Sequence, residues 1–174
     1  LLAGIECDIR SDGKLDLSED CLAQLDIVIA SVHSSFKQDE REMTDRILHA
    51  IESPVVDIVG HPTGRLLLRR EPYNINIDEL IESAATHGVA LEINSQPQRR
   101  DLNEVYAKRA RDRGVKLVIS TDAHAPDQFH VLDWGLLVAR RAWLEPSDIL
   151  NTQPITELLA SLRRKKHSTR KEDR

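Results

Sequence analysis

The sequence predicts an α/β fold built from parallel β/α units. Three observations support this prediction: five short apolar runs typical of strands, amphipathic helical patterns between several of them, and polar residues that end three of the runs. Alternating strand and helix patterns are typical of domains with a parallel sheet. The expected strands are residues 2–9, 26–32, 55–60, 89–94 and 116–121, and the expected helices are residues 39–51, 77–87 and 103–113.

Start and stop signals delimit the predicted helices. Acidic residues open the first helix at 39–42 and the second at 78–79, where they interact favourably with the helix N-terminus. Gly88 and Gly114 follow the second and third helices, as expected of residues that end a helix. These local signals favour the same division of the chain as the apolar patterns do.

The chain after Gly135 is harder to assign. Residues 145–148 and 153–154 contain prolines that predict the entries to two short terminal helices. Residues 163–174 are basic and lack apolar side chains, which predicts a disordered tail that is either solvated or in contact with nucleic acid. We therefore expect one domain over residues 1–162, followed by the tail.

Composition excludes several classes of protein. The 174 residues, 40% hydrophobic and 30% charged, suit one soluble domain with a sizeable core. Because no apolar run is long enough to span a membrane and no signal peptide begins the chain, we expect a cytoplasmic protein without membrane contacts. Cys7 and Cys21 are too few and too scattered for a disulfide framework, and the net charge of -5 restricts any DNA contact to a local basic patch.

Histidines and a carboxylate stand where three of the predicted strands end. His33 follows the second run, His61 follows the third, and Asp122 and His124 follow the fifth. Residues two positions apart in an extended chain point to the same side, and the carboxyl ends of barrel strands carry the chemistry of such folds. One histidine after a strand is more often structural, but the repetition favours a shared metal site.

Glu6 interrupts the apolar pattern of the first predicted strand. A carboxylate buried there without a partner would be costly, and a metal ion would offset that cost. A solvent-facing position is an equal alternative, and Asp8 on the same face is a competing ligand. From the residues alone both alternatives stay open.

Three arginines, Arg65, Arg69 and Arg70, lie directly downstream of His61. The planar guanidinium group matches phosphate oxygens with two parallel hydrogen bonds. The alternative is an exposed loop whose arginines pair with Glu71 or solvent. A metal site nearby favours phosphate recognition, so we expect these arginines to bind substrate.

Four motifs, in this order, resemble the PHP (polymerase and histidinol phosphatase) domain of bacterial family X DNA polymerases. They are residues 4–6 (GIE), 30–33 (ASVH), 60–62 (GHP) and 121–124 (TDAH), and residues 63–68 and 150–152 resemble the family X version. The likeness extends over nearly the whole chain up to the basic tail. Domains of this family fold as a distorted (β/α)7 barrel with a trinuclear centre of manganese or zinc at the carboxyl ends of the strands.

The resemblance implies a role for each candidate ligand. Glu6 would bridge two metal ions, His33 and His61 would complete the shell of one of them, Asp122 would serve the other, and His124 would serve a third. The implied activity is 3′ to 5′ exonucleolytic hydrolysis of DNA in repair by metal-activated water, without a separate protein general base. The implied partners are DNA and the polymerase domains of the same parent chain.

The chain departs from the family pattern at its start. No His-x-His motif occurs in the sequence, and the chain begins in the middle of what looks like a strand, with no leading turn before Leu1. We therefore expect a partial distorted (β/α)7 barrel of the PHP type whose N-terminal strands, first ligands and polymerase domains lie upstream, and which exposes sheet edges. Two alternatives to the nuclease stay open: a phosphomonoesterase of the histidinol-phosphatase type and a non-catalytic scaffold.

Overall fold

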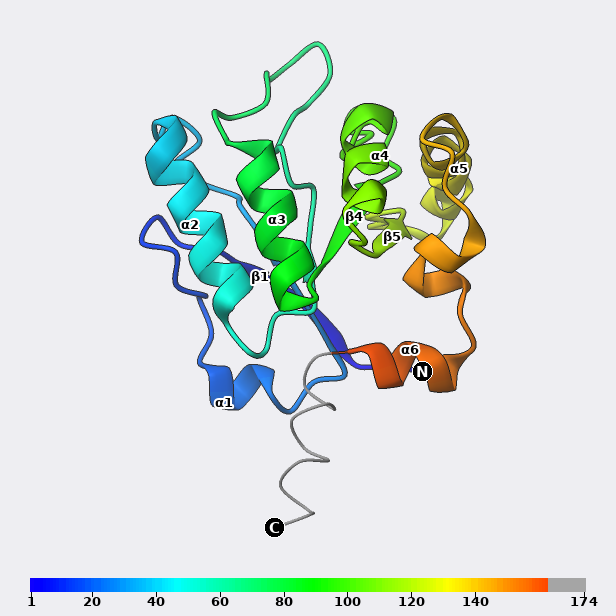
Figure 1. The fold of residues 1–174 in the computed structure, drawn as a ribbon, viewed down its shortest axis with the longest axis horizontal. Helices are drawn as coiled ribbons and strands as arrows, with labels where there is room; N and C mark the ends of the chain where they lie inside the picture. The colour runs from blue at the N-terminus through cyan, green and yellow to red at the C-terminus, as the bar shows by residue number, and fades with distance from the viewer. Residues whose placement is uncertain (163–174) are drawn as a thin grey trace.

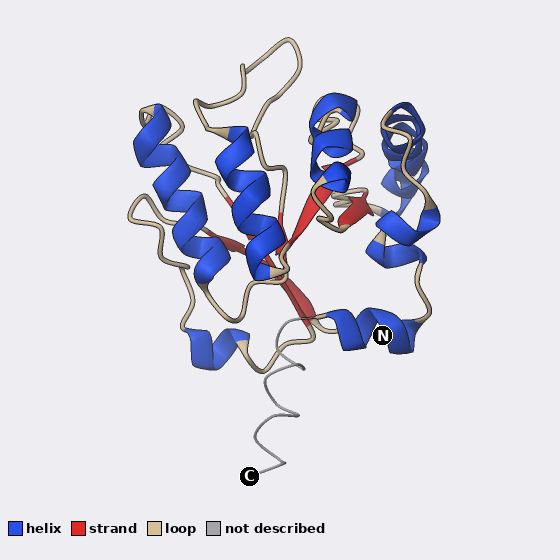
Figure 2. Cartoon of the chain, in the orientation of Figure 1, coloured by secondary structure: helices blue, strands red, loops and turns tan. Residues whose placement is uncertain are grey.

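The computed structural model describes residues 1–162, so the predicted tail at 163–174 lies outside the described residues. Parallel strands form one sheet in the order β1-β2-β3-β4-β5 (Figures 1 and 2). Their bounds are β1 (Gly4–Asp8), β2 (Ile27–Ser31), β3 (Ile58–Val59), β4 (Ala90–Asn94) and β5 (Leu117–Ser120). The predicted α/β class is confirmed.

The three predicted helices are confirmed to within one residue at each end, as α2 (Glu40–Glu52), α3 (Ile77–His87) and α4 (Glu104–Asp112). Helical segments also follow each predicted proline entry near the C-terminus. The remaining segments are α1 (Glu19–Leu22), η1 (Pro126–Val131), α5 (Leu132–Arg141), η2 (Pro146–Asp148), η3 (Leu150–Thr152) and α6 (Ile155–Ser161). Within residues 1–162, no helix is both long and apolar enough to cross a membrane.

The order of the strands determines where the helices lie. Because parallel crossovers are right-handed, a sheet whose strands follow each other in chain order receives all of its crossover helices on one face. Helices α2, α3, α4 and α5 accordingly pack side by side, each against the next (Figure 1). This arrangement is compatible with part of a barrel. Closure into a (β/α)7 barrel stays a prediction, because β1 and β5 are the outermost strands of the described sheet.

The two faces of the sheet carry different side chains. The face toward α2–α5 holds the main apolar core, which includes Ile47, Leu80, Leu91, Ile93 and Leu117. The opposite face is apolar near the amino ends of its strands, where Ile58 and Ala90 pack with Leu150 and Leu158. Toward the carboxyl ends the same face turns polar, because Glu6 and Glu92 replace aliphatic residues there.

Strand β3 is shorter than predicted, since the prediction of a strand over 55–60 is wrong at its start. The backbone N–H of Val28 donates to the Asp57 carboxylate at 2.9 Å rather than to a carbonyl of the neighbouring strand. Val55 and Val56 are buried in the core but precede the ladder. A side chain thus occupies the position at which regular strand pairing would begin.

Both cysteines have free thiols, which agrees with the absence of a disulfide framework predicted from the sequence. Cys7 is buried in the main core and Cys21 is exposed. Burial raises the pKa of the Cys7 thiol to about 12. Cys7 therefore packs as a small apolar side chain, as expected.

Helix α5 was not predicted, because Gly135 interrupts its helical pattern and apolar side chains surround it on several sides. Leu132, Trp134, Leu136 and Leu137 are all partly exposed, so the hydrophobic period is obscured. A Cβ atom on Gly135 would overlap the Ser95 hydroxyl oxygen and lie only 2.6 Å from Ile119 Cγ2. Glycine therefore allows α5 to approach the sheet closely.

Substitution of Gly135 by alanine is expected to destabilise the protein by about 2 kcal/mol, because overpacking against β5 outweighs a gain of about 1 kcal/mol in helix propensity. Urea unfolding followed by circular dichroism measures this difference. Thr86→Ala on the exposed surface of α3 is the control and should leave the free energy of unfolding within about 0.5 kcal/mol of wild type. A stabilised Gly135→Ala variant would contradict this account of α5.

Candidate metal centre

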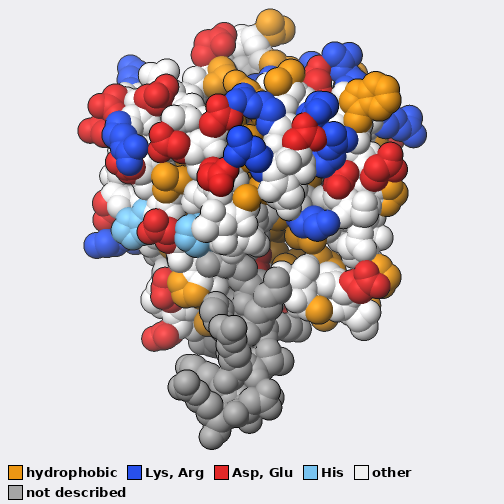
Figure 3. All heavy atoms as spheres, viewed as in Figure 1, with side chains coloured by type: hydrophobic (Ala, Val, Ile, Leu, Met, Phe, Trp, Pro, Cys, Tyr) orange, Lys and Arg blue, Asp and Glu red, His pale blue; other side chains and the backbone are white. Residues whose placement is uncertain are grey.

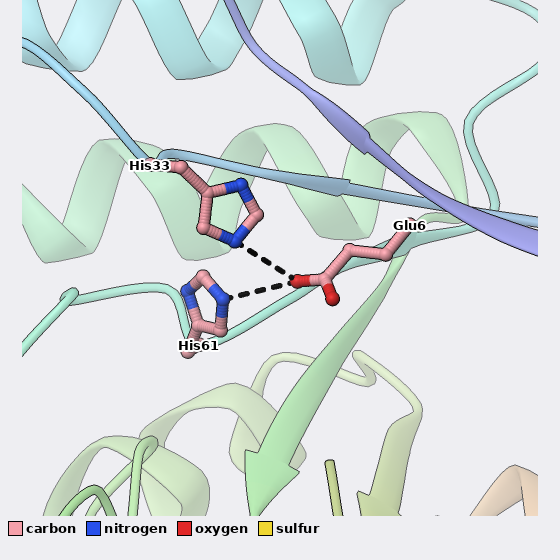
Figure 4. A group of neighbouring side chains, drawn as sticks. All are labelled: Glu6, His33 and His61. Atoms are coloured by element: carbon pink, nitrogen blue, oxygen red, sulfur yellow. Dashed lines mark ion pairs between the residues drawn. The ribbon is translucent and has the colours of Figure 1, made fainter. Parts of the chain in front are cut away.

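Glu6, His33 and His61 form a compact group at the carboxyl ends of β1, β2 and β3 (Figure 4). One potential ligand atom from each residue lies within 4.8 Å of the other two. Glu6 Oε1 is 3.0 Å from Nε2 of His61 and 3.4 Å from Nε2 of His33. Imidazole nitrogens and a carboxylate oxygen are a donor set that suits zinc or manganese.

The strands bring these three side chains together from distant parts of the sequence. Glu6 lies on β1 and points to the polar end of the sheet face opposite α2–α5, while the two histidines belong to the loops that leave β2 and β3 (Figure 4). The imidazole rings of His33 and His61 meet edge to face, with centroids 5.1 Å apart and an interplanar angle of 69°. Both rings therefore face the same carboxylate.

The backbone at His61 is strained in a way that places its ring. His61 has a φ of 28°, in a region that residues other than glycine rarely adopt. The preceding residue, Gly60, has no space for a side chain, because a Cβ atom there would overlap the Ser31 hydroxyl oxygen and lie 3.0 Å from Ile29 Cγ2 and 3.6 Å from Glu6 Oε1. The Gly60-His61 pair thus allows the carboxylate and the imidazole to share one small space.

Glu6 and the two histidines influence one another's protonation, because the carboxylate and the imidazoles form hydrogen bonds and carry opposite charges. The imidazoles of His33 and, second, His61 hold the pKa of Glu6 well below its usual range. The Glu6 carboxylate, with a smaller contribution from Asp8, raises the pKa of His33 to about 9. Without a cation the group therefore holds an ionised Glu6 and a protonated His33 at neutral pH.

Asp8 is a partner of His33 rather than a fourth member of the group. Its carboxylate contacts Nδ1 of His33, while Nε2 of the same ring faces Glu6. Carboxylates that bond the second nitrogen of a histidine fix its tautomer and orientation for metal binding. The sequence left Glu6 and Asp8 as competitors, and the structure gives them different positions around one imidazole.

The residues present fit a divalent cation. The side chain of His61 is 2% exposed, and its Nδ1 atom is buried without a hydrogen-bond partner among the described residues. A buried nitrogen that lacks a partner is unusual in proteins and needs a functional explanation. The ionised Glu6 lies beside the other ring nitrogen of His61, Nε2, and supplies the negative charge that a cation requires.

Metal binding is expected to release about one proton per ion at pH 7, because a cation must replace the proton that His33 carries below a pKa of about 9. Metal affinity should therefore rise with pH up to about 9 and level off above it. Calorimetric titration with Mn²⁺ in two buffers of different ionisation enthalpy measures the release. Asp8→Asn should reduce it and weaken affinity roughly tenfold. Affinity that is independent of pH between 6 and 8 would contradict this interpretation.

Glu92, a buried residue of β4 that contacts the backbone of His61, was not identified from the sequence. Its Oε2 atom accepts the backbone N–H of His61 at 2.5 Å and the amide of Asn94 at 3.4 Å, and Ser120 donates its hydroxyl to Oε1. Burial raises the pKa of Glu92. The sequence did carry a signal for this residue, since an acid interrupts the apolar run 89–94 just as Glu6 interrupts the first strand.

Asp122 and His124 lie outside the Glu6–His33–His61 group. The Asp122 carboxylate accepts the amide of Asn94 at 3.1 Å and is 3.4 Å from Nε of Arg99. The His124 side chain is 81% exposed, and its Nδ1 atom is 2.9 Å from the Asp122 carbonyl oxygen. The roles of these two residues at further metal ions stay predictions.

The three downstream arginines differ in their contacts. Arg65 donates to two backbone carbonyl groups at residues 99–100, and Arg70 donates to the Gly64 carbonyl at 2.8 Å. Arg69 is exposed and has no ion-pair or hydrogen-bond partner for its side chain among residues 1–162. Phosphate binding by all three stays a prediction. Of the three guanidinium groups, the one of Arg69 has no partner among the described residues and is available to a ligand.

Comparisons with known proteins reveal two kinds of relative. The chain is 44% identical over 164 residues to the DNA polymerase/3′-5′ exonuclease PolX of Bacillus subtilis, an alignment that covers 94% of this chain and 29% of that protein. It is 34% identical over 177 residues to a probable phosphatase of Thermoanaerobacter sp., covering 95% of this chain and 70% of the relative. A probable phosphatase of Shewanella oneidensis is 32% identical over 178 residues, an alignment that covers 97% of this chain and 68% of that protein. No protein-family model matches the chain.

Proposed function

Because this chain belongs to the PHP family of metal-dependent phosphoesterases, we propose that Glu6, His33 and His61 hold a divalent cation that serves phosphoester hydrolysis. The observation that carries this proposal is the convergence of three ligand atoms within 4.8 Å of one another. A bound divalent cation supplies positive charge that polarises a phosphate ester and activates water. Manganese and zinc both suit the donor set, and we propose that Asp122 and His124 serve further ions.

The protein side chains keep the site ready for a cation. Glu6 stays ionised at neutral pH, since the two imidazoles lower its pKa. Asp8 orients His33 through its Nδ1 atom, and the buried Glu92 carboxyl group holds the backbone of His61. We assign no separate general base to the chain.

We propose a DNA 3′ end as the substrate, within DNA repair. This choice is supported by 44% identity over 94% of the chain to PolX, whose name describes both a polymerase and a 3′-5′ exonuclease. The chain spans 29% of the length of PolX, so polymerase domains of a common parent chain are proposed partners rather than observed ones. The exposed Arg69, which follows His61 in the loop between β3 and α3, provides a positive group for phosphate.

Phosphomonoester hydrolysis is the second candidate function. It is favoured by the probable phosphatases of Thermoanaerobacter and Shewanella, of which the chain spans 70% and 68%. These relatives match the chain over a larger share of their own length than PolX does. A monoester substrate would use the same three ligands.

The choice of substrate distinguishes the exonuclease from the phosphomonoesterase. With Mn²⁺, the chain should release nucleotides from the 3′ end of a 5′-labelled oligonucleotide and leave p-nitrophenyl phosphate largely intact. His61→Ala should lower this activity at least 100-fold, whereas His87→Ala, in the last turn of α3, should retain wild-type activity. Hydrolysis of the monoester alone would favour the phosphatase, and equal activity of the two histidine variants would refute the proposed site.

A further inference from the structure

A tight hairpin stands in the loop between β3 and α3 (Figure 1). Leu66 and Arg70 form an antiparallel bridge at its base, and the N–H groups of Arg69 and Arg70 donate to the Leu66 carbonyl at 2.9 and 2.7 Å. Leu68 lies at the tip with a φ of 63° and a fully exposed side chain. In Figure 3, hydrophobic side-chain atoms lie at the top of the molecule, where Figure 1 places this loop. An apolar residue in left-handed backbone at a solvated tip is costly, which points to a binding role.

The hairpin is fastened to a second loop that follows β4. Leu67 donates its N–H to the Gln98 carbonyl at 2.6 Å, and Arg65 donates from Nε to the Arg99 carbonyl at 2.8 Å. The two loops border an open hollow of about 810 Å³ on the surface of the protein. Its walls are formed by Leu67, Leu68, Arg69, Pro97, Gln98 and Arg100.

The hollow combines apolar walls with positive charge. None of the six described residues that line it is acidic, and two of them are arginines. Arg69 is exposed and has no side-chain partner among the described residues, while Arg100 donates to the Pro97 carbonyl at 3.2 Å and lies 5.3 Å from the Trp134 ring. A nucleotide has the complementary character, since its base offers a flat, largely apolar face and its phosphate is anionic.

We propose that this hollow binds one nucleotide of single-stranded DNA, with the base against Leu67 and Leu68 and the phosphate on Arg69 and Arg100. The inference rests on the proposed function, because the hairpin leaves the metal centre directly after His61 and would guide a strand end toward it. Arg65 and Arg70 then hold the loop in shape through backbone carbonyl groups rather than contacting DNA.

Binding of a fluorescein-labelled oligothymidylate to the full chain in EDTA, followed by fluorescence anisotropy, tests the proposal without hydrolysis. Leu68→Asn introduces a residue that tolerates left-handed backbone but removes the apolar surface, and it should weaken binding about tenfold. Arg69→Ala should weaken binding about fivefold and reduce the slope of log Kd against log salt by about 0.7.

The matched controls are Leu137→Asn and Arg140→Ala, which remove an exposed leucine and an exposed arginine from α5. Both should bind oligothymidylate as wild type does. Equal affinities of the hairpin and control variants would overturn the inference, as would a wild-type chain that does not bind oligothymidylate.

Hydrolysis of bis(p-nitrophenyl) phosphate by the unmodified chain with Mn²⁺ reports the proposed function separately, because this small diester does not need the hollow. Hydrolysis without oligothymidylate binding would overturn the inference and leave the proposed function standing. Binding that depends on Leu68 and Arg69, without hydrolysis of the diester, would support the inference and contradict the proposed catalytic function.

Discussion

Glu6→Gln is expected to weaken Mn²⁺ binding at least 100-fold while leaving the fold intact. The substitution keeps the shape of the side chain but removes the negative charge that faces both His33 and His61. Metal ions require ionised carboxylate ligands, and the ionised form of Glu6 is the one that the site stabilises, as its lowered pKa indicates. Calorimetric titration of wild type and variant measures the affinity and the number of ions bound.

Glu52→Gln, on the exposed surface of α2, is the control for this charge change and should bind Mn²⁺ as wild type does. Affinity within threefold of wild type for Glu6→Gln would show that the cation binds elsewhere. A wild-type stoichiometry above one ion per chain would indicate that Asp122 or His124 contributes to a further site.

Glu92→Ala is expected to lower the free energy of unfolding by about 3 kcal/mol. It leaves the backbone N–H of His61 and the hydroxyl of Ser120 without their buried partner and opens a cavity. Glu92→Gln should cost much less, because an amide can accept from His61 and donate to the Ser120 oxygen. Urea unfolding in the presence of EDTA measures both values, and equal losses in the two variants would contradict this hydrogen-bond account.

The comparison of wild type with Glu92→Gln should also depend on pH. Burial raises the pKa of Glu92 in the folded protein above its ordinary value of 4.5, so the folded state holds this proton more tightly than the unfolded chain. The stability that Glu92 contributes is therefore fully present below about pH 4.5 and lost as the pH rises through the folded pKa. Glu92→Gln should gain stability relative to wild type as the pH rises above 4.5.

Local signals account for most of the secondary structure. The helix start expected at residues 39–42 contains a complete capping box between Asp39 and Glu42, and Gly88 ends α3 with a φ of 67°. The start of β3 and the existence of α5 were not predictable in this way. They depend on Asp57 bonding to Val28 and on Gly135 packing against Ile119, contacts between residues far apart in the chain.

The candidate site was partly predictable for the same reason. His33 and His61 follow strands, and parallel strands in chain order place their carboxyl ends at one edge of the sheet. The residues alone left the choice between Glu6 and Asp8 open, because both lie on the same face of β1, and only the family resemblance favoured Glu6. The register with β2 and the rotation of the His33 ring decide it.

The sequence by itself determined the α/β class, the main helices and the residue types that could bind a metal, because these follow from periodicity, helix caps and side-chain chemistry. The tertiary structure alone decided which of these residues meet, that the Glu92 carboxyl group accepts the backbone N–H of His61, and that Leu68 and Arg69 border a hollow. The physical reason is distance, since a ligand type is a property of one residue, whereas a site depends on strand register and loop packing across the whole fold.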